Sequence, residues 1–286
     1  MEYSATQFVD DLNHFLENDT GNHKYEHALH KGIESGSSNF CKILLNHAFI
    51  KDIDYEWNGL TALMLASQYA YPQLTEILIK MGANIDKVSS GGNIALHWAI
   101  SCGIDDNVNI LINNGADINL YDPIHKSAAL IYAVNTENTS VIKLLIDKGA
   151  NVNAENIYGN TALTLVAIKK NNPENLKILI ENGANIYHKN KDDCTALDMA
   201  KKYHCTENIK ILEEADKKIQ GEMKKISESE IKKIPEIESR EEDKICCYGK
   251  DCLNLKKGIC TFEHKEKCAY AENCLNYAKG LCPLQH

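Results

Sequence analysis

The chain has 286 residues, of which 40 are acidic and 31 are basic, giving a formal net charge of −9 at pH 7. This balance argues against a protein that attracts nucleic acid over its whole surface, and the length allows two domains. Seven of the eleven cysteines follow residue 245, which favours zinc in a reducing compartment over a disulfide framework. We find no secretory signal and no apolar run of the ~20 residues that a membrane span requires, so we expect an intracellular protein, cytoplasmic or nuclear.

The N-terminal segment predicts one amphipathic helix. Ser4-x-x-Gln7 is a capping-box pattern that marks the start of a helix. The apolar residues that follow on one helical face are Phe8, Val9, Leu12, Phe15 and Leu16. We therefore expect residues 1–22 to form a helical cap on the domain that follows.

The next segment, residues 23–214, repeats with a period of 33 to 34 residues. One recurring triplet begins at Thr61, Ile94, Ala128, Thr161 and Thr195, and a second begins at Gly82, Gly115, Gly149 and Gly183. A period of this length is typical of stacked repeat proteins, in which no single unit can bury its apolar face alone.

Each unit predicts two short helices and an extended loop. Thr61 and Thr161 can cap the first helix, and Ala66 and its counterparts are small enough for two helices to approach closely. The second helix carries an apolar triplet such as 77–79, and the glycine after it suits the left-handed residue that ends a helix.

These motifs resemble ankyrin repeats. The TPLHLA motif of that family appears as TALMLA at residues 61–66 and as IALHWA at 94–99, with alanine in place of proline. The resemblance implies an all-α solenoid of about five to six helix-turn-helix repeats that binds a protein partner. It also implies that His97, at the histidine position of the motif, makes hydrogen bonds to a turn. Trp98 beside it is expected to pack in the core, with a groove as the alternative.

The variable loop tips are the candidate partner contacts. They are Lys87, Ser89, Tyr121, His125, Ile157, Tyr158 and Asp192. We find no Ser-His-Asp order, phosphate loop, HExxH or DxDxDG pattern, so the sequence predicts neither an enzyme nor a small-molecule substrate.

Residues 215–243 form a charged segment rich in Glu, Lys and Ile. Ile219, Met223 and Ile226 predict that the last helix continues into it. Beyond these residues the composition is typical of a charged tether.

Residues 244–286 contain one ligand spacing twice, 22 residues apart, and each copy reads C-x5-C-x7-C-x3-H. The two sets are Cys246, Cys252, Cys260 and His264, then Cys268, Cys274, Cys282 and His286. Three thiols and an imidazole are the ligands of a closed structural Zn²⁺ site, so the pattern predicts two small irregular fingers that the metal stabilises. Cys247 is the alternative first ligand, but the 22-residue offset, which also aligns Tyr248 with Tyr270, favours Cys246.

The spacing resembles CCCH zinc fingers, and its short first gap is similar to that of tandem fingers in polyadenosine-binding proteins. The resemblance implies single-stranded RNA, A-rich RNA included, as a ligand. Bases would stack on Tyr248, Phe262, Tyr270 and Tyr277, and phosphates would contact Lys256, Lys257 and Lys279.

Charge weakens this RNA hypothesis. Residues 243–286 hold seven lysines and five acidic residues, and two sites of three thiolates on a divalent ion cancel that excess. The alternative is that the aromatic residues only pack around zinc, in a structural or second protein-interaction module of a purely protein-binding scaffold.

Overall fold

The computed structural model describes residues 4–16, 21–47, 49–170, 173–231, 245–246 and 263–264. Two compact units divide the chain, Met1–Gln220 and Gly221–His286, and each is described by itself.

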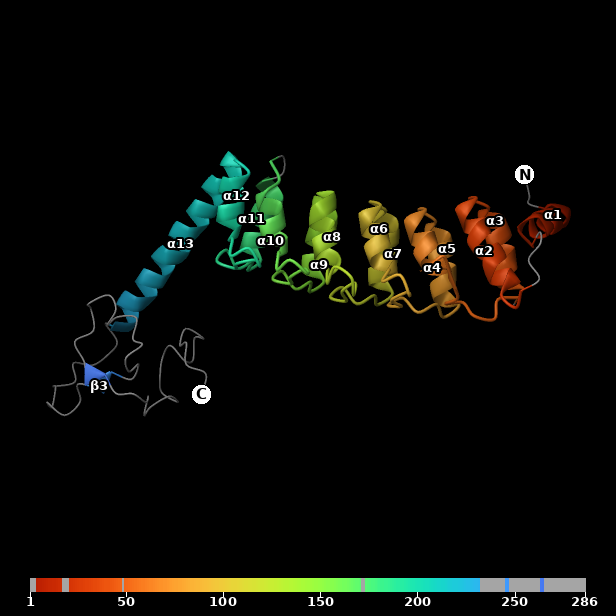
Figure 1. The fold of residues 1–286 in the computed structure, drawn as a ribbon, viewed down its shortest axis with the longest axis horizontal. Coiled ribbons are helices and arrows are strands. Elements are labelled where there is room, and N and C mark those ends of the chain that lie inside the picture. Colours follow the sequence, from red (N-terminus) through yellow and green to blue (C-terminus); the bar gives the residue numbers. More distant parts are fainter. Residues whose placement is uncertain are drawn as a thin grey trace. The chain divides into compact units, whose positions relative to one another are not determined.

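Helices dominate the first unit. After α1 (Ala5–Leu16), the described residues form six consecutive helix pairs (Figure 1). The pairs are α2 (Lys24–Glu34) with α3 (Ser38–Asn46), α4 (Ala62–Gln68) with α5 (Pro72–Lys80), α6 (Ala95–Ser101) with α7 (Asp105–Asn113), α8 (Ala129–Thr136) with α9 (Thr139–Asp147), α10 (Ala162–Ala167) with α11 (Pro173–Glu181), and α12 (Ala196–Lys202) with α13 (Thr206–Ile231). The predicted helix-turn-helix repeats are confirmed. Helix α13 is 26 residues long and continues through Ile219, Met223 and Ile226.

The helices stack in two rows. The first helices of successive pairs pack on one another from α2 to α12, and the second helices pack likewise where α3 meets α5, α5 meets α7 and α9 meets α11. The leucine is buried in this interior in four of the opening triplets, at Leu63, Leu96, Leu130 and Leu163, and partly buried in the fifth, at Leu197. Ala66, Ala99, Ala133 and Ala200 are each 0 % exposed, so each is fully enclosed where the helices meet.

Local sequence sets the ends of these helices. The hydroxyl groups of Thr61, Thr161 and Thr195 accept a hydrogen bond from the backbone N–H three residues on, at 3.2 to 3.4 Å. The glycine after the second helix has a φ of 85–92°, as Gly82 and Gly149 illustrate, a conformation that other residues adopt only with strain. Both predictions about the unit are confirmed.

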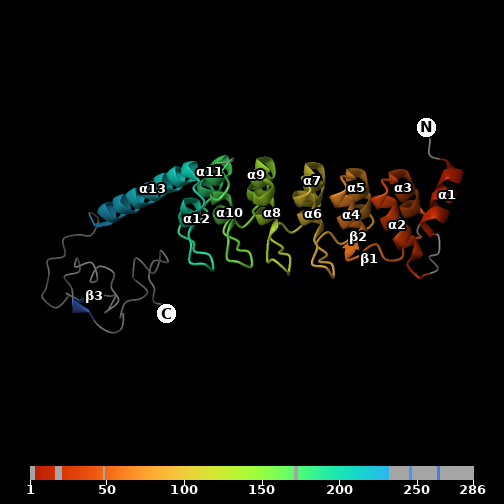
Figure 2. The same cartoon turned by 45° about the horizontal axis from the view of Figure 1, so that its top comes forward.

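A polar ladder joins the loops, which all lie on one side of the helix rows (Figure 2). In each step an Asp or Asn side chain accepts a hydrogen bond from a backbone N–H of the next loop. The acceptor–donor pairs are Asp54 with Asn84, Asp86 with Asp117, Asn119 with Asn151, and Asn153 with Asn185, at 2.8 to 2.9 Å. The ladder holds neighbouring loops in a fixed register.

Strand is scarce in the described residues. Strands β1 (Glu56–Trp57) and β2 (Leu60–Thr61) form a two-residue antiparallel hairpin, and Glu155 bridges to Thr161 in a later loop. In the second unit, β3 (Ile245–Cys246) pairs in parallel with β4 (Glu263–His264).

Helix α1 packs on the first pair, α2 and α3. The Oγ atom of Ser4 accepts the N–H of Gln7 at 3.1 Å, as the capping pattern predicts. The Phe15 ring lies 4.8 Å from the Phe40 ring, centroid to centroid. Val9 does not take part in this packing, since its side chain is 50 % exposed.

Buried asparagine side chains link the pairs in a way that the periodicity did not reveal. Asn107 is 0 % exposed, and its Nδ2 atom donates to the carbonyl groups of Ala66 and Ser67, each at 3.0 Å. Its Oδ1 atom accepts the hydroxyl group of Thr75 at 3.2 Å. The side chain on α7 therefore provides a hydrogen-bond donor to the last carbonyl groups of α4, across the repeat interface.

We expect Asn107→Ala to lower the free energy of unfolding by about 1–3 kcal/mol, because the buried carbonyls lose their donor. Asn107→Val, which introduces the residue found at the corresponding position 141, restores volume but no donor and should remain destabilised. Urea unfolding monitored by circular dichroism measures both variants. Asn109→Ala, on the exposed side of α7, is the matched control, and an equal loss in that variant would contradict the assignment.

Candidate functional site

The loop tips carry exposed apolar side chains. Tyr121 is 58 % exposed and Ile124 is 55 % exposed in the loop before α8, and Tyr158 is 64 % exposed in the loop before α10. Ile157 beside it is 36 % exposed. We call these four residues the tip patch. Exposed aromatic and aliphatic residues that recur on neighbouring loops are a feature of protein-binding surfaces.

Backbone hydrogen bonds hold the tips together. The N–H of Ile157 donates to the carbonyl of His125 at 2.7 Å, and the N–H of Lys191 donates to the carbonyl of Tyr158 at 3.1 Å. The loops before α8, α10 and α12 are thereby tied in sequence. A partner would meet tips that are already ordered, which reduces the entropy lost on binding.

One buried carboxylate organises the tip before α8. Asp122 is 3 % exposed and accepts the backbone N–H groups of Ile124, His125 and Ser127, together with the Tyr132 hydroxyl at 2.9 Å. Burial acts to raise the pKa of Asp122, but the hydrogen bonds from His125, Ser127 and Tyr132 outweigh it, and the pKa lies below its usual value. The side chain is therefore an anion that holds the tip in shape.

The predicted partner contacts fall into two groups. Tyr121, His125, Ile157, Tyr158 and Asp192 are exposed at the tips, and their contact with a partner stays a prediction. The exposed Ile124 was missed by the sequence analysis, although its place between two selected tip residues was a usable signal.

Two of the predicted contacts are engaged within the chain. The prediction for Ser89 is wrong: it is 5 % exposed, and its Oγ atom accepts the N–H of Asn93 at 3.1 Å. Lys87 is half-buried, and its Nζ atom donates to the carbonyl of Asp54 and lies 3.6 Å from Glu56 Oε1. Both side chains mainly hold their own loop.

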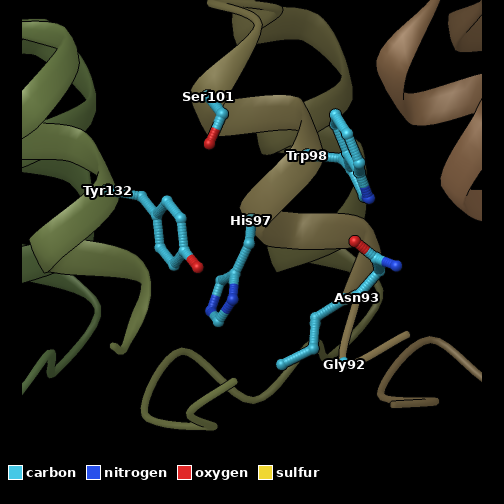
Figure 3. A pocket seen from close by; sticks show the side chains of 7 residues that line it. Gly92, Asn93, His97, Trp98, Ser101 and Tyr132 are labelled. Atoms are coloured by element: carbon cyan, nitrogen blue, oxygen red, sulfur yellow. The ribbon is translucent and has the colours of Figure 1, made fainter. Parts of the chain in front are cut away.

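A groove of about 200 Å³ lies over α6 (Figure 3). It is lined by Gly92, Asn93, Ile94, His97, Trp98, Ser101 and Tyr132. Trp98 also packs in part against the core, so the two alternatives for this residue are both realised. The tryptophan and Tyr132 flank the helix on opposite sides, and the His97 ring stacks on Tyr132 with centroids 4.6 Å apart.

The turn hydrogen bond expected of His97 is at most a weak one, to the carbonyl of Leu120 in the next loop. Its ring is 4 % exposed, and neither ring nitrogen has a hydrogen-bond partner of good geometry. The Leu120 carbonyl and the Asp122 carboxylate are near enough to raise its pKa, but burial dominates and lowers the pKa to about 4. His97 is therefore a neutral imidazole whose ring nitrogens are buried and poorly satisfied.

This burial predicts a loss of stability in acid. The pKa of histidine in an unfolded chain is near 6.5. Between that pH and about 4, His97 is therefore protonated in the unfolded chain but neutral in the folded chain. We expect the free energy of unfolding to fall by ~1.4 kcal/mol per pH unit from 6.5 to 4, about 3 kcal/mol in all. His97→Phe, which can keep the stack on Tyr132, should flatten urea-unfolding profiles over that range. An unchanged slope in the variant would contradict this prediction.

For the predicted zinc ligands, the structure describes two backbone positions. The β3–β4 pairing sets Cys246 directly opposite His264, the first and last ligands of the first predicted set. The remaining predicted ligands lie outside the described residues: Cys252, Cys260, Cys268, Cys274, Cys282 and His286. The predicted RNA contacts also lie outside them: Tyr248, Phe262, Tyr270, Tyr277, Lys256, Lys257 and Lys279. Elsewhere in the described part of the chain, no group of three or more His, Cys, Asp or Glu side chains is placed to hold a metal ion.

The stacked helix pairs and ordered loop tips define a helical repeat protein of the kind that presents a surface to other proteins. The family model for ankyrin repeats matches residues 3–89, 29–122, 96–190 and 130–221, and the chain belongs to the ankyrin-repeat family. Ankyrin-repeat proteins are generally adaptors without enzymatic activity. Among the residues that can be described, no helix is long and apolar enough to cross a membrane.

Two curated proteins are similar in sequence to parts of the chain. The fowlpox virus (strain NVSL) ankyrin repeat protein FPV031 is 40 % identical over 81 residues, which cover 26 % of this chain and 23 % of the viral protein. Human neurogenic locus notch homolog protein 2 is 30 % identical over 95 residues, covering 33 % of this chain and 4 % of its own length. The chain thus spans a quarter or less of these curated relatives.

A solved structure supports the fold. A chain from the complex of the Bd0816 predatory endopeptidase of Bdellovibrio bacteriovorus with immunity protein Bd3460 superposes with a TM-score of 0.60 and 27 % identity. The match covers 65 % of this chain and 96 % of that one.

Proposed function

We propose that the chain is a non-enzymatic adaptor whose ankyrin array holds a protein partner through the tip patch. The observation that carries this proposal is the exposure of Tyr121, Ile124, Ile157 and Tyr158 on loops that are fixed by Asp122 and by loop-to-loop hydrogen bonds. Tyrosines that become buried when two proteins bind often contribute most of the binding free energy. A rigid tip loses little entropy on binding.

The test has two stages. Proteins retained by the immobilised full chain are identified, and the affinity of the best-retained one is then measured by titration calorimetry. We expect Tyr121→Ser with Tyr158→Ser to weaken binding at least tenfold, because two aromatic contacts are lost. Tyr203→Ser, at an exposed tyrosine that ends α12, is the control and should bind normally. Equal affinities for the two variants would refute the tip patch as the interface.

We propose that residues 244–286 form tandem CCCH fingers that hold two Zn²⁺ ions and contact single-stranded RNA. The repeated C-x5-C-x7-C-x3-H spacing supports zinc, as does the β3–β4 pairing of Cys246 with His264. A Cys and a His on adjacent strands are a donor pair that suits Zn²⁺. Four protein ligands leave no open position at such a site, so its role is structural.

RNA contact rests on the resemblance and on the aromatic residues Tyr248, Phe262, Tyr270 and Tyr277. Binding should depend on base stacking more than on charge, since the fingers carry little net positive charge. Fluorescence titration of the zinc-loaded full chain with homopolymeric RNAs at low salt tests it, with Phe262→Ala and Tyr270→Ala as variants. Two bound zinc ions without RNA affinity would favour the protein-binding scaffold instead.

A further inference from the structure

The groove over α6 has features that the tip patch does not explain. Its floor is one face of the helix, since Ile94, His97, Trp98 and Ser101 follow one another at intervals of three, one and three residues. Tyr132 of α8 closes one side and Trp98 stands on the other (Figure 3). With a volume of about 200 Å³, the groove has room for one side chain.

The polar groups in this groove offer acceptors without positive charge. Neutral His97 adds no charge, and both of its ring nitrogens are buried. The Ser101 hydroxyl is exposed at the end of α6. The side-chain amide of Asn93 uses its nitrogen to bond the Gly59 carbonyl and Ser89, so its oxygen faces the groove as a further acceptor. No lysine or arginine is among the lining residues.

The surrounding charge is negative. Residues 51–150, which contain the groove, hold eleven acidic and six basic residues. The nearest charge behind the aromatic wall is the Asp122 carboxylate, which accepts the Tyr132 hydroxyl and acts on His97. An anionic ligand would be repelled here, whereas a cation gains from the carboxylate and from the face of Trp98.

We propose that the groove over α6 is a binding site for the guanidinium group of an arginine, supplied by a basic segment of the protein partner. A guanidinium is planar, can stack on the Trp98 ring and has five N–H donors for the acceptors of Asn93 and Ser101. The proposal rests on the proposed function only for the source of the arginine. The chemistry of the groove itself is independent of the tip patch.

The groove and the tip patch form one continuous surface. Ile124 of the tip lies over Gly92, which lines the groove: a Cβ atom at position 92 would come within 2.9 Å of the isoleucine Cδ1. A segment that packs on Ile124 therefore passes the mouth of the groove. An arginine a few residues along the same segment can enter it.

The test uses the full chain and a small probe. The chain has two tryptophans, Trp57 and Trp98, so the two indole N–H signals in ¹⁵N NMR report on the groove and on an internal reference. The probe is acetyl-Gly-Arg-Gly-amide, compared with its neutral citrulline isostere and with acetyl-Gly-Glu-Gly-amide. We expect the arginine peptide to shift the Trp98 signal with a millimolar Kd and leave Trp57 unmoved, and the other two peptides to bind at least tenfold more weakly.

Two variants guard against a folding artefact. Trp98→Leu removes the aromatic wall, and Ser101→Arg, at an exposed position, fills the groove with a cation of the chain itself. Binding of the arginine peptide should fall at least tenfold in both variants. The Trp98 signal reports binding in Ser101→Arg, and the His97 ring signals report it in Trp98→Leu. Equal binding of the citrulline peptide, or unchanged binding in Ser101→Arg, would overturn the proposal. Tyr121→Ser with Tyr158→Ser should bind the peptide normally, so a failed tip patch and a failed groove give different results.

Discussion

Asp122→Ala is expected to lower the free energy of unfolding by about 3–5 kcal/mol, which is among the larger effects of a single substitution. The buried carboxylate accepts the backbone N–H groups of Ile124, His125 and Ser127 and the hydroxyl of Tyr132. Without it, four donors lose their acceptor, and each unsatisfied group costs about 1–3 kcal/mol, an amount that entering water partly relieves.

Urea unfolding and amide hydrogen exchange measure this effect. Exchange should accelerate first at residues 122–128, because the tip before α8 opens locally. Asp122→Asn retains one acceptor oxygen and should fall between the alanine variant and the parent. Asp147→Ala, at an exposed aspartate that ends α9, is the control and should stay within ~0.5 kcal/mol. A loss below 1 kcal/mol in Asp122→Ala would show that water replaces the carboxylate.

Acid should weaken the same contact. The pKa of Asp122 is lowered in the folded chain, so its contribution to stability is complete above the ordinary aspartate pKa. That contribution is lost as the pH falls through the lower folded value. The His97 effect sets in at higher pH, which separates the two residues in a titration.

The second large effect is expected in the predicted fingers. Structural zinc supplies about 10–16 kcal/mol of binding free energy in small finger peptides, and domains of this size have little core of their own. We expect two Zn²⁺ ions per chain by elemental analysis. Cys252→Ser and Cys274→Ser should each release one ion, and deletion of His286 should release the second-finger ion.

Cys246 and Cys247 provide a matched pair for the register of the first finger. Cys246→Ser is expected to lose one zinc ion, whereas Cys247→Ser should keep both. The reverse result would show that the first spacing is C-x4-C. A parent chain with fewer than two zinc ions would contradict the paired sites altogether.

Local signals explain why much of the array could be predicted from the sequence. The hydroxyl of Thr61 caps a helix within three residues of itself, and the left-handed backbone at Gly82 is a property of that one residue. Repetition multiplies such signals, because each unit presents the same short-range choices again.

The features that could not be predicted from the sequence depend instead on tertiary contacts. Ser89 is buried because Asn93 of its own loop folds back on it, and His97 is buried against Tyr132 of the next pair. Asn107 acts on a helix 40 residues earlier. These outcomes depend on how side chains from different repeats meet, which the period alone does not encode.

The groove over α6 could not be predicted either. Trp98 and Tyr132 come from successive repeats, at the position that Leu65 and Leu165 hold in other units, and an aromatic ring at this position does not by itself indicate a groove. Their aromatic faces flank one helix only after α6 and α8 have packed together.

The polar ladder of the loops has a consequence for how this array can change in length. Asp54, Asp86, Asn119 and Asn153 make the same bond to the loop that follows, so each joint between neighbours is chemically interchangeable. Excising one whole unit, for example residues 87–119, would place Asp86 where Asn119 now accepts the backbone N–H of Asn151. A chain built in this way can gain or lose complete modules by recombination while the remaining bonds of the ladder are preserved.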